Sequence, residues 1–270
     1  MLFRSSATLR PFDVAAAVLG LEDPDTMAFG MTFPTGNRRT LAVGTPALFA
    51  SERDDPRVQS AVADALRDVV RFTPGNVLAF FPSYAESARY ADRLDGTVEA
   101  TLYRDQAGVR AEDLRESFVD GDDGLLVTSL WGTLAEGVSF DGDDARAVVV
   151  VGVPYPRLDD RTEAVQAAYE TVGDDEDAGW RYAVEIPTIR KTRQAVGRVV
   201  RGPDEVGTRV LLDERYTERA SNEMGIYGVR STFPPDEREE MVDVDPEKVK
   251  FSLLNFFTGH DAYDGEPPRP

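Results

Sequence analysis

The segment QAVGRVVR, residues 194–201, has the residue types and the spacing to bind a phosphate group. Successive residues of an α-helix turn by about 100°, so a helix here would separate its side chains into two arcs. Guanidinium groups suit phosphate or carboxylate because they donate paired hydrogen bonds in one plane. The alternative is an amphipathic helix whose arginines are only solvated. The polar arc lies within roughly 60° of Gln194 and adds Gly197, Arg198 and Arg201, whereas the aliphatic arc, which must face a core, holds Ala195, Val196, Val199 and Val200.

A complete nucleotide site would need residues that this sequence lacks. No GxxxxGK[ST] segment occurs, so the phosphate-binding loop of the P-loop NTPases is absent. The stretch RVLLDERY, residues 209–216, is similar to an apolar strand that ends in a magnesium-binding Asp-Glu pair. Without a phosphate loop, we predict instead that Asp213 and Arg215 orient neighbouring loops through hydrogen bonds. We predict no metal site, because the chain has no cysteine and only one histidine, His260.

The charge balance bears on possible partners. The formal net charge is −19, and Lys191, Lys248 and Lys250 are the only lysines in the chain. Such a balance normally argues against nucleic-acid binding, which needs local positive potential. Proteins adapted to high salt carry acidic residues over the whole surface and avoid lysine. We therefore favour adaptation to high salt over an acidic recognition surface as the explanation of this charge balance. Contacts with nucleic acid would have to come from local arginines, backbone amides and hydroxyls.

Nothing in the sequence indicates a membrane or secreted protein. No run of 18 apolar residues occurs, although a membrane-spanning helix needs about that many. The start, MLFRSSATLRPF, lacks a charged region followed by an apolar one, so no secretion signal is predicted. We therefore expect a cytoplasmic protein with no membrane partner.

Alternating strand and helix patterns predict an α/β fold. Such alternation is typical of a parallel sheet with helices on both faces, whose ligands bind at the carboxyl ends of the strands. We expect irregular structure over residues 1–45, a loop at 173–179 and a disordered end, DGEPPRP. The predicted helices cover residues 56–72, 84–94, 111–119, 159–171 and 181–201, and the predicted strands cover 77–81, 97–103, 124–130, 146–155 and 208–213.

Four motifs in order, followed by a late helical segment, resemble the second motor domain of superfamily 2 DNA helicases of the XPD/DinG type. We refer to three of them by the family's motif numbers: FFPSY (80–84) is similar to motif IV, TSLWGTLAEGVSF (128–140) to motif V, and QAVGRVVR (194–201) to motif VI. SATLRP (6–11) is similar to the motif that joins the two motor domains, and KVKFSLLNFF (248–257) to the closing helix. The resemblance implies a RecA-like fold without its own phosphate loop.

The resemblance also divides the chain. Residues 1–45 would be a remnant of the inter-domain junction, 46–235 the motor domain, and 236–270 a helix and a disordered tail. In this family two RecA-like domains clamp ATP, and the first supplies the phosphate loop, the Mg²⁺ ligands and an iron–sulfur domain. The resemblance thus implies ATP and Mg²⁺ as cofactors shared with a missing N-terminal motor domain, and single-stranded DNA as a partner. It also implies 5′→3′ movement, a role in DNA repair, and no hydrolysis by this chain alone. The alternative function is a non-catalytic module that binds DNA or a repair protein.

Site residues follow from the resemblance position by position. Gln194, Arg198 and Arg201 would face the γ-phosphate as catalytic residues, with the arginines acting as fingers, and Gly197 would leave room for close approach. Glu136 and Gly137 would lie near the nucleotide. Ser83, Tyr84, Thr128 and Ser129 would contact single-stranded DNA, and Ser6 and Thr8 would relay between the two sites.

The sequence departs from the family pattern at two positions in motif V. Ser139 stands where the family usually has aspartate, which puts a nucleotide or coupling role at this position in doubt. Trp131 stands where a basic residue is common. An indole can stack on a base, but we favour buried packing for Trp131.

Overall fold

The computed structural model describes residues 10, 12–28, 33–136, 138–172 and 177–270. Its centre is a seven-stranded sheet in the order β3-β4-β2-β5-β6-β1-β7, and every pair of neighbouring strands is parallel. The predicted parallel sheet is therefore confirmed. The strands are β1 (Arg38–Val43), β2 (Val77–Phe81), β3 (Thr101–Arg104), β4 (Gly124–Ser129), β5 (Ala147–Val151), β6 (Gly207–Leu212) and β7 (Met241–Val244).

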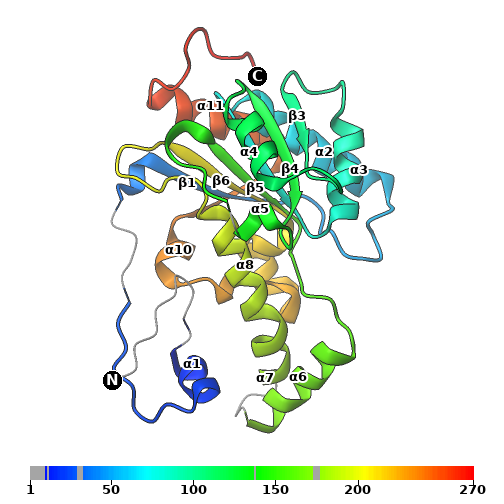
Figure 1. Ribbon diagram of the computed structural model, residues 1–270, viewed down its shortest axis with the longest axis vertical. Coiled ribbons are helices and arrows are strands. Elements are labelled where there is room, and N and C mark those ends of the chain that lie inside the picture. The colour runs from blue at the N-terminus through cyan, green and yellow to red at the C-terminus, as the bar shows by residue number, and fades with distance from the viewer. Residues whose placement is uncertain (1–9, 11, 29–32, 137, 173–176) are drawn as a thin grey trace.

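Helices cover both faces of the sheet, as the alternation of elements predicted. On one face α2, α3 and α11 pack on one apolar cluster, and on the other α4, α5 and α8 pack on a second (Figure 1). The helices are α1 (Phe12–Leu19), α2 (Pro56–Arg71), α3 (Tyr84–Leu94), α4 (Ala111–Val119), α5 (Thr133–Glu136), α6 (Asp160–Val172), α7 (Ala178–Trp180), α8 (Ile186–Val196), α9 (Glu218–Glu223), α10 (Pro235–Glu239) and α11 (Val249–Gly259).

The strand residues divide between the two cores by simple alternation. In β2, Val77, Ala79 and Phe81 join the α2–α3–α11 core, whereas Leu78 and Phe80 join the other. Side chains of a strand point alternately to opposite faces, so a strand covered on both faces must be apolar throughout. This explains the uninterrupted run VLAFF and why it could be recognised as a strand from sequence.

Helix α2 begins where local chemistry dictates. Asp55 caps its start by accepting a hydrogen bond from the Arg57 amide at 2.8 Å, and Pro56 occupies the first turn. A carboxylate oxygen satisfies one of the free amides of a first turn, and proline fits there because that position needs no N–H donor.

Figure 1 shows that α6, α7 and the amino-terminal part of α8 extend away from the sheet.

Two strands were missed in the sequence. Residues 38–43, which we expected to be irregular, form β1 between β6 and β7. Its polar residues hid the pattern: Arg38 is buried because its Nε donates to Glu240 at 2.7 Å. Strand β7 lies at the edge of the sheet, and half of its residues are exposed, so its sequence lacks an apolar run.

Several predicted boundaries were also wrong. The strand predicted at 97–103 begins only at Thr101, since Thr97 closes α3 by donating from Oγ1 to the Leu94 carbonyl at 2.9 Å. The strand predicted at 146–155 ends at Val151, because Gly152 adopts a positive φ of 68°. A left-handed residue cannot continue a strand.

The tail was expected to be disordered, but the structure places it against α2. Tyr263 donates from its hydroxyl to the Phe72 carbonyl at 2.8 Å, and Arg71 donates to the Arg269 carbonyl at 3.1 Å. The Tyr263 ring also lies near Phe257, with the ring centroids 6.3 Å apart. An aromatic residue just before the polar segment therefore anchors it.

Gly207 offers a test of the packing between motif VI and the sheet. A Cβ atom at this position would collide with the Val199 Cγ1 atom and would lie 3.0 Å from the Arg146 carbonyl oxygen. Because the branched valine side chain is stiff, we expect Gly207→Ala to lower the free energy of unfolding by about 1–3 kcal/mol. Denaturant unfolding measures this loss. Gly36→Ala is the control, since a Cβ there meets nothing within 4 Å, and equal effects of the two changes would contradict the prediction.

Candidate functional site

The predicted motifs meet on the side of the sheet where the strands end. We call this side, which holds the carboxyl ends of the strands, the carboxyl edge. Strands β2, β4, β5 and β6 are parallel, so their carboxyl ends lie along the same edge. Motif IV ends β2, motif V follows β4, and the stretch behind motif VI ends β6. Segments separated by more than a hundred residues therefore share one surface, where ligands of such sheets bind.

Motif VI is not one continuous helix, contrary to our prediction. Helix α8 ends at Val196, and Gly197 caps it by donating from its amide to the Arg193 carbonyl at 3.0 Å. Val199 and Val200 are nevertheless buried, although Val200 has a positive φ of 62°. The aliphatic residues thus reach the core from an irregular turn, which the burial of both side chains stabilises.

Arg198 connects motif VI to motif V. Its guanidinium donates to the carbonyl oxygens of Ala135 and Val138. These two residues lie on either side of Glu136, the last residue of α5, and of Gly137, which is outside the described residues. Burial of the guanidinium lowers its pKa, and the nearby charge of Arg201 adds to this effect. The structure therefore brings together Arg198 and the segment predicted to lie near the nucleotide.

Arg201 is held more loosely. Its Nη1 atom lies 2.7 Å from Asp141 Oδ1, in an ion pair whose side chains are 40% and 68% exposed. Its backbone amide donates to Glu205 at 2.8 Å. An ion pair this exposed contributes about 0–1 kcal/mol, so the guanidinium can exchange Asp141 for another anion. Gln194, two residues before the end of α8, is also exposed.

Ser83 and Tyr84 lie where motif IV was expected to meet DNA. Ser83 caps α3 by accepting from the Glu86 amide at 3.2 Å, and its side chain is half-buried. Tyr84 is 44% exposed. Its phenol interacts with Asp105, and burial together with this carboxylate raises the Tyr84 pKa. Asp105 was not predicted, although an aspartate two residues after the strand predicted at 97–103 was a usable signal.

Thr128 and Ser129 do not reach the surface. We expected their hydroxyls at the DNA backbone, but both side chains are buried at the end of the covered strand β4. Thr128 Oγ1 donates to Asp105 Oδ2 at 2.6 Å, and Ser129 Oγ accepts from the Trp131 amide at 3.2 Å. Within this chain the two hydroxyls therefore hold the loops of the site rather than face a phosphate.

Trp131 corrects our preference for buried packing. Its side chain is 45% exposed, and Lys191 Nζ lies 5.1 Å from the centroid of its ring. The residue belongs to the turn between β4 and α5, beyond the strand that is covered on both faces, so it has no core to enter. Ser139, the other departure in motif V, is exposed, and its carbonyl accepts from Arg115 at 2.6 Å.

Asp213 and Arg215 act as predicted on neighbouring loops. Asp213 Oδ2 accepts from the Leu48 amide at 2.9 Å and from Arg215 Nη2 at 2.7 Å, while Oδ1 accepts from Arg215 Nε at 2.8 Å. Both side chains are buried, and Arg215 lies 4.4 Å from the Phe49 ring centroid. With both carboxylate oxygens in use, Asp213 is not available to Mg²⁺. Among the described residues, no cluster of three or more His, Cys, Asp or Glu side chains is placed to hold a metal.

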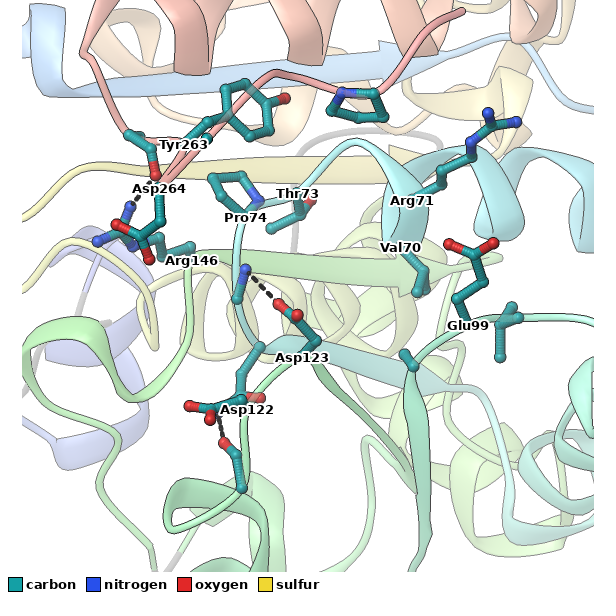
Figure 2. Close-up of a pocket in the computed structure, with 18 of the residues that line it drawn as sticks. Val70, Arg71, Thr73, Pro74, Glu99, Asp122, Asp123, Arg146, Tyr263 and Asp264 are labelled. Carbon is teal, nitrogen blue, oxygen red and sulfur yellow. Dashed lines mark hydrogen bonds between the residues drawn. The ribbon is translucent and has the colours of Figure 1, made fainter.

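A separate cavity of 1120 Å³ lies at the opposite edge of the sheet. It is lined by the segments that precede β2, β3, β4 and β5 and by residues 262–268 of the tail. Figure 2 shows Asp123 accepting from Gly75, at 3.1 Å, and Arg146 close to the tail, whose Ala262 carbonyl accepts from Arg146 at 3.0 Å. The amino ends of the strands surround this cavity, so it is not part of the candidate site.

In the part of the chain that the structure describes, no helix combines the length and the apolar character needed to cross a membrane.

The fold and the position of the motifs define a RecA-like α/β domain whose loops gather at the carboxyl edge. Comparison with solved structures supports this class: an XPD helicase matches with a TM-score of 0.59 at 22% identity, over 77% of this chain and 35% of that one. Xpd4 of S. tokodaii matches with a TM-score of 0.55 at 18% identity, over 77% and 39%.

The sequence matches the helicase C-terminal domain family over residues 66–227, which is more than half of the chain. The chain therefore belongs to this family and is of the XPD type. The general transcription and DNA repair factor IIH helicase subunit XPD of Schizosaccharomyces pombe is 27% identical over 231 residues, which are 78% of this chain and 30% of the relative.

Other relatives agree. The ATP-dependent DNA helicase chl1 of S. pombe is 27% identical, over 68% of this chain and 24% of its own length. The regulator of telomere elongation helicase 1 homolog of Drosophila melanogaster is 24% identical, over 79% and 24%. The chain thus spans less than a third of the length of these curated relatives.

The two ion pairs at this edge predict contrasting mutant stabilities. Arg215→Met leaves the buried Asp213 carboxylate without its partner, so we expect the free energy of unfolding to fall by about 3–5 kcal/mol. Arg201→Met removes an exposed pair and should change it by about 0–1 kcal/mol. Denaturant unfolding compares the two proteins. A double change, Asp213→Leu with Arg215→Met, should be less damaging than Arg215→Met alone, and the opposite order would contradict this assignment.

Proposed function

We propose that this chain is the second motor domain of an ATP-dependent DNA helicase. It presents Arg201 and Gln194 to an ATP molecule bound by a first motor domain, and Arg198 positions motif V beside them. The observation that carries this proposal is the pairing of a fixed arginine with a loosely held one at the carboxyl edge. Arg198 is bound to motif V, while Arg201 is solvent-accessible beside it.

The two arginines have different roles in this proposal. Arg201 exchanges its exposed contact with Asp141 for the γ-phosphate and stabilises the charge that develops as the phosphoryl group is transferred. Arg198 is a positioning residue, because two of its donors already hold the carbonyls of Ala135 and Val138. Movement of motif VI would therefore move motif V. Motif V begins in β4, the strand that ends in Thr128 and Ser129.

The remaining parts of the ATP site come from the first motor domain. The sequence lacks a phosphate loop, and Asp213, the acid most similar to a magnesium ligand, has both oxygens occupied. Bound Mg²⁺ would neutralise charge on the β- and γ-phosphates, and its ligands would lie on the partner domain. This chain adds guanidinium donors, an exposed amide from Gln194, and the close approach that Gly197 allows.

The DNA contacts are proposed on the same edge. Ser83 and Tyr84 stand at the end of β2, with Tyr84 exposed, and Thr128 and Ser129 support the adjoining loop from below. The name of the S. pombe XPD relative refers to transcription and DNA repair. A repair helicase that moves 5′→3′ along single-stranded DNA is the corresponding proposal for this chain.

ATP hydrolysis by the complete helicase tests the proposal. We expect Arg201→Ala to lower the kcat for DNA-stimulated ATP hydrolysis by roughly 10³- to 10⁵-fold, because an arginine finger has about this effect in related NTPases. The assay joins this chain to its first motor domain, either fused or mixed, and measures phosphate release. Arg219→Ala is the matched control, since Arg219 also forms an exposed ion pair, 2.9 Å from Glu223, but on α9.

The outcomes separate the two candidate functions. A large loss with Arg201→Ala and none with Arg219→Ala supports the motor domain. If the combined domains hydrolyse ATP equally well with Ala at position 201, the finger assignment is wrong. If no combination hydrolyses ATP while this chain alone binds single-stranded DNA, the chain is a binding module without catalytic function.

A further inference from the structure

We infer that Trp131, Tyr84 and Lys191 form a surface on which unpaired DNA bases stack, and that this surface binds with little dependence on salt. The inference rests on the proposed function, because it assumes that single-stranded DNA passes the carboxyl edge. It adds the chemistry of recognition: contact with the faces of the bases rather than with phosphates. The three side chains come from the turn before α5, from α3 and from α8.

Tyr84 is held in a defined position. Burial and the charge of the nearby Asp105 carboxylate raise the pKa of the Tyr84 phenol, and Asp105 accepts from Thr128 Oγ1 at the end of β4 at 2.6 Å. The ring lies over Gly132, where a Cβ atom would collide with the Tyr84 hydroxyl and approach its Cζ atom to 3.0 Å. A side chain at position 132 would therefore displace the Tyr84 hydroxyl, so the turn that carries Trp131 packs closely against Tyr84.

Trp131 is fixed in the same turn. Its amide donates to Ser129 Oγ at 3.2 Å, and the next amide, of Gly132, donates to the Ser129 carbonyl at 2.9 Å. The backbone is therefore ordered while the indole remains 45% exposed. Tyr84 packs against Gly132, and Trp131 is the residue before it, so two exposed rings are attached to one ordered turn. Exposed aromatic rings of this kind suit stacking with bases.

Lys191 supplies positive charge at this position. The chain carries a net charge of −19 and has only three lysines, of which the other two lie next to or within α11. Lys191 Nζ lies 5.1 Å from the centroid of the Trp131 ring. A cation over an aromatic ring is attracted by the ring's electrons, so Lys191 stays beside the surface where a strand would approach. It offsets the local acidity without requiring a basic patch.

This chemistry differs from phosphate binding in a measurable way. Each phosphate contact made by a lysine or arginine adds about 0.7 to the slope of log K against log salt for a single strand. Stacking releases no counterions and adds nothing to that slope. A surface of two rings and one lysine therefore predicts a shallow salt dependence, which suits a chain with a net charge of −19.

Fluorescence anisotropy with the full chain tests the inference. The probe is a short fluorescein-labelled oligothymidylate, and the comparison strand has the same backbone with abasic sites. We expect Trp131→Ala to weaken oligothymidylate binding roughly 5- to 100-fold at every salt concentration, with an unchanged slope. Trp131→Phe should retain most of the affinity because a phenyl ring still stacks. The wild-type chain should bind the abasic strand even more weakly than the Trp131→Ala protein binds oligothymidylate, because an abasic strand also loses its stacking on Tyr84.

Phe251→Ala is the matched control. Phe251 is 50% exposed, and Lys250 Nζ lies 5.3 Å from its ring centroid, so the pair resembles Trp131 with Lys191 but lies on α11. We expect no change in affinity from this substitution. Trp131→Arg should recover binding only at low salt, with a slope steeper by about 0.7.

Three outcomes overturn the inference: equal binding by wild type and Trp131→Ala, equal binding of the abasic and base-bearing strands, or no binding of either strand. None of them decides the proposed function, which depends on the ATPase effect of Arg201→Ala. If that effect is present and Trp131→Ala binds normally, the motor assignment stands and the stacking surface fails. Trp131 is exposed, so we expect the Trp131→Ala protein to keep the midpoint of thermal unfolding of the wild type. An unchanged midpoint shows that altered binding does not come from misfolding.

Discussion

Parallel pairing is the constraint on which the other features of this protein depend. When every strand runs in the same direction, all the chain's strand-to-helix turns are brought to one edge of the sheet. The turns after β2, β4, β5 and β6 are far apart in sequence and share no local interaction, yet they become neighbours here. Apolar helices on both faces fix the register, because a slip by one residue would exchange the two sets of buried side chains. The packing of the two cores therefore determines how accurately the side chains at the carboxyl edge are positioned.

Two arginines at this edge show how burial changes the use of the same side chain. Arg215 is fully buried, so it needs Asp213 as a partner, and together they fix the loop that contains Leu48. Arg198 is half-buried and satisfies its guanidinium with two backbone carbonyls instead of a carboxylate. A carbonyl carries no full charge, so the positive charge of Arg198 is not neutralised and still acts on its surroundings. The first arrangement provides rigidity, and the second keeps a cation beside motif V.

The acidic composition and the proposed DNA contacts are compatible because contact is local and screened. Salt at physiological concentration screens exposed charges beyond about 8 Å, so repulsion by distant carboxylates matters less than the groups at the edge. Those groups are two exposed rings, one lysine, and Arg201, whose acidic partner Asp141 is itself exposed. The local chemistry of a surface, rather than the net charge of the chain, thus governs which ligand it can accept.

The sequence by itself determined the class of fold, the motifs and their order. These features depend on local periodicity and on residue types, which can be recognised without knowledge of tertiary contacts. VLAFF and the segment 84–94 were correctly predicted as strand and helix, since a strand covered on both faces is apolar throughout and Ser83 caps the start of the helix. Tertiary structure decided what depends on distant partners. Arg38 hid β1 because its charge is paired with Glu240, and Val199 and Val200 reached the core from a turn rather than from a helix. It also reversed two exposures, burying Thr128 and exposing Trp131. Burial is a property of the assembled fold, since a side chain's solvent access is set by elements that are remote in sequence.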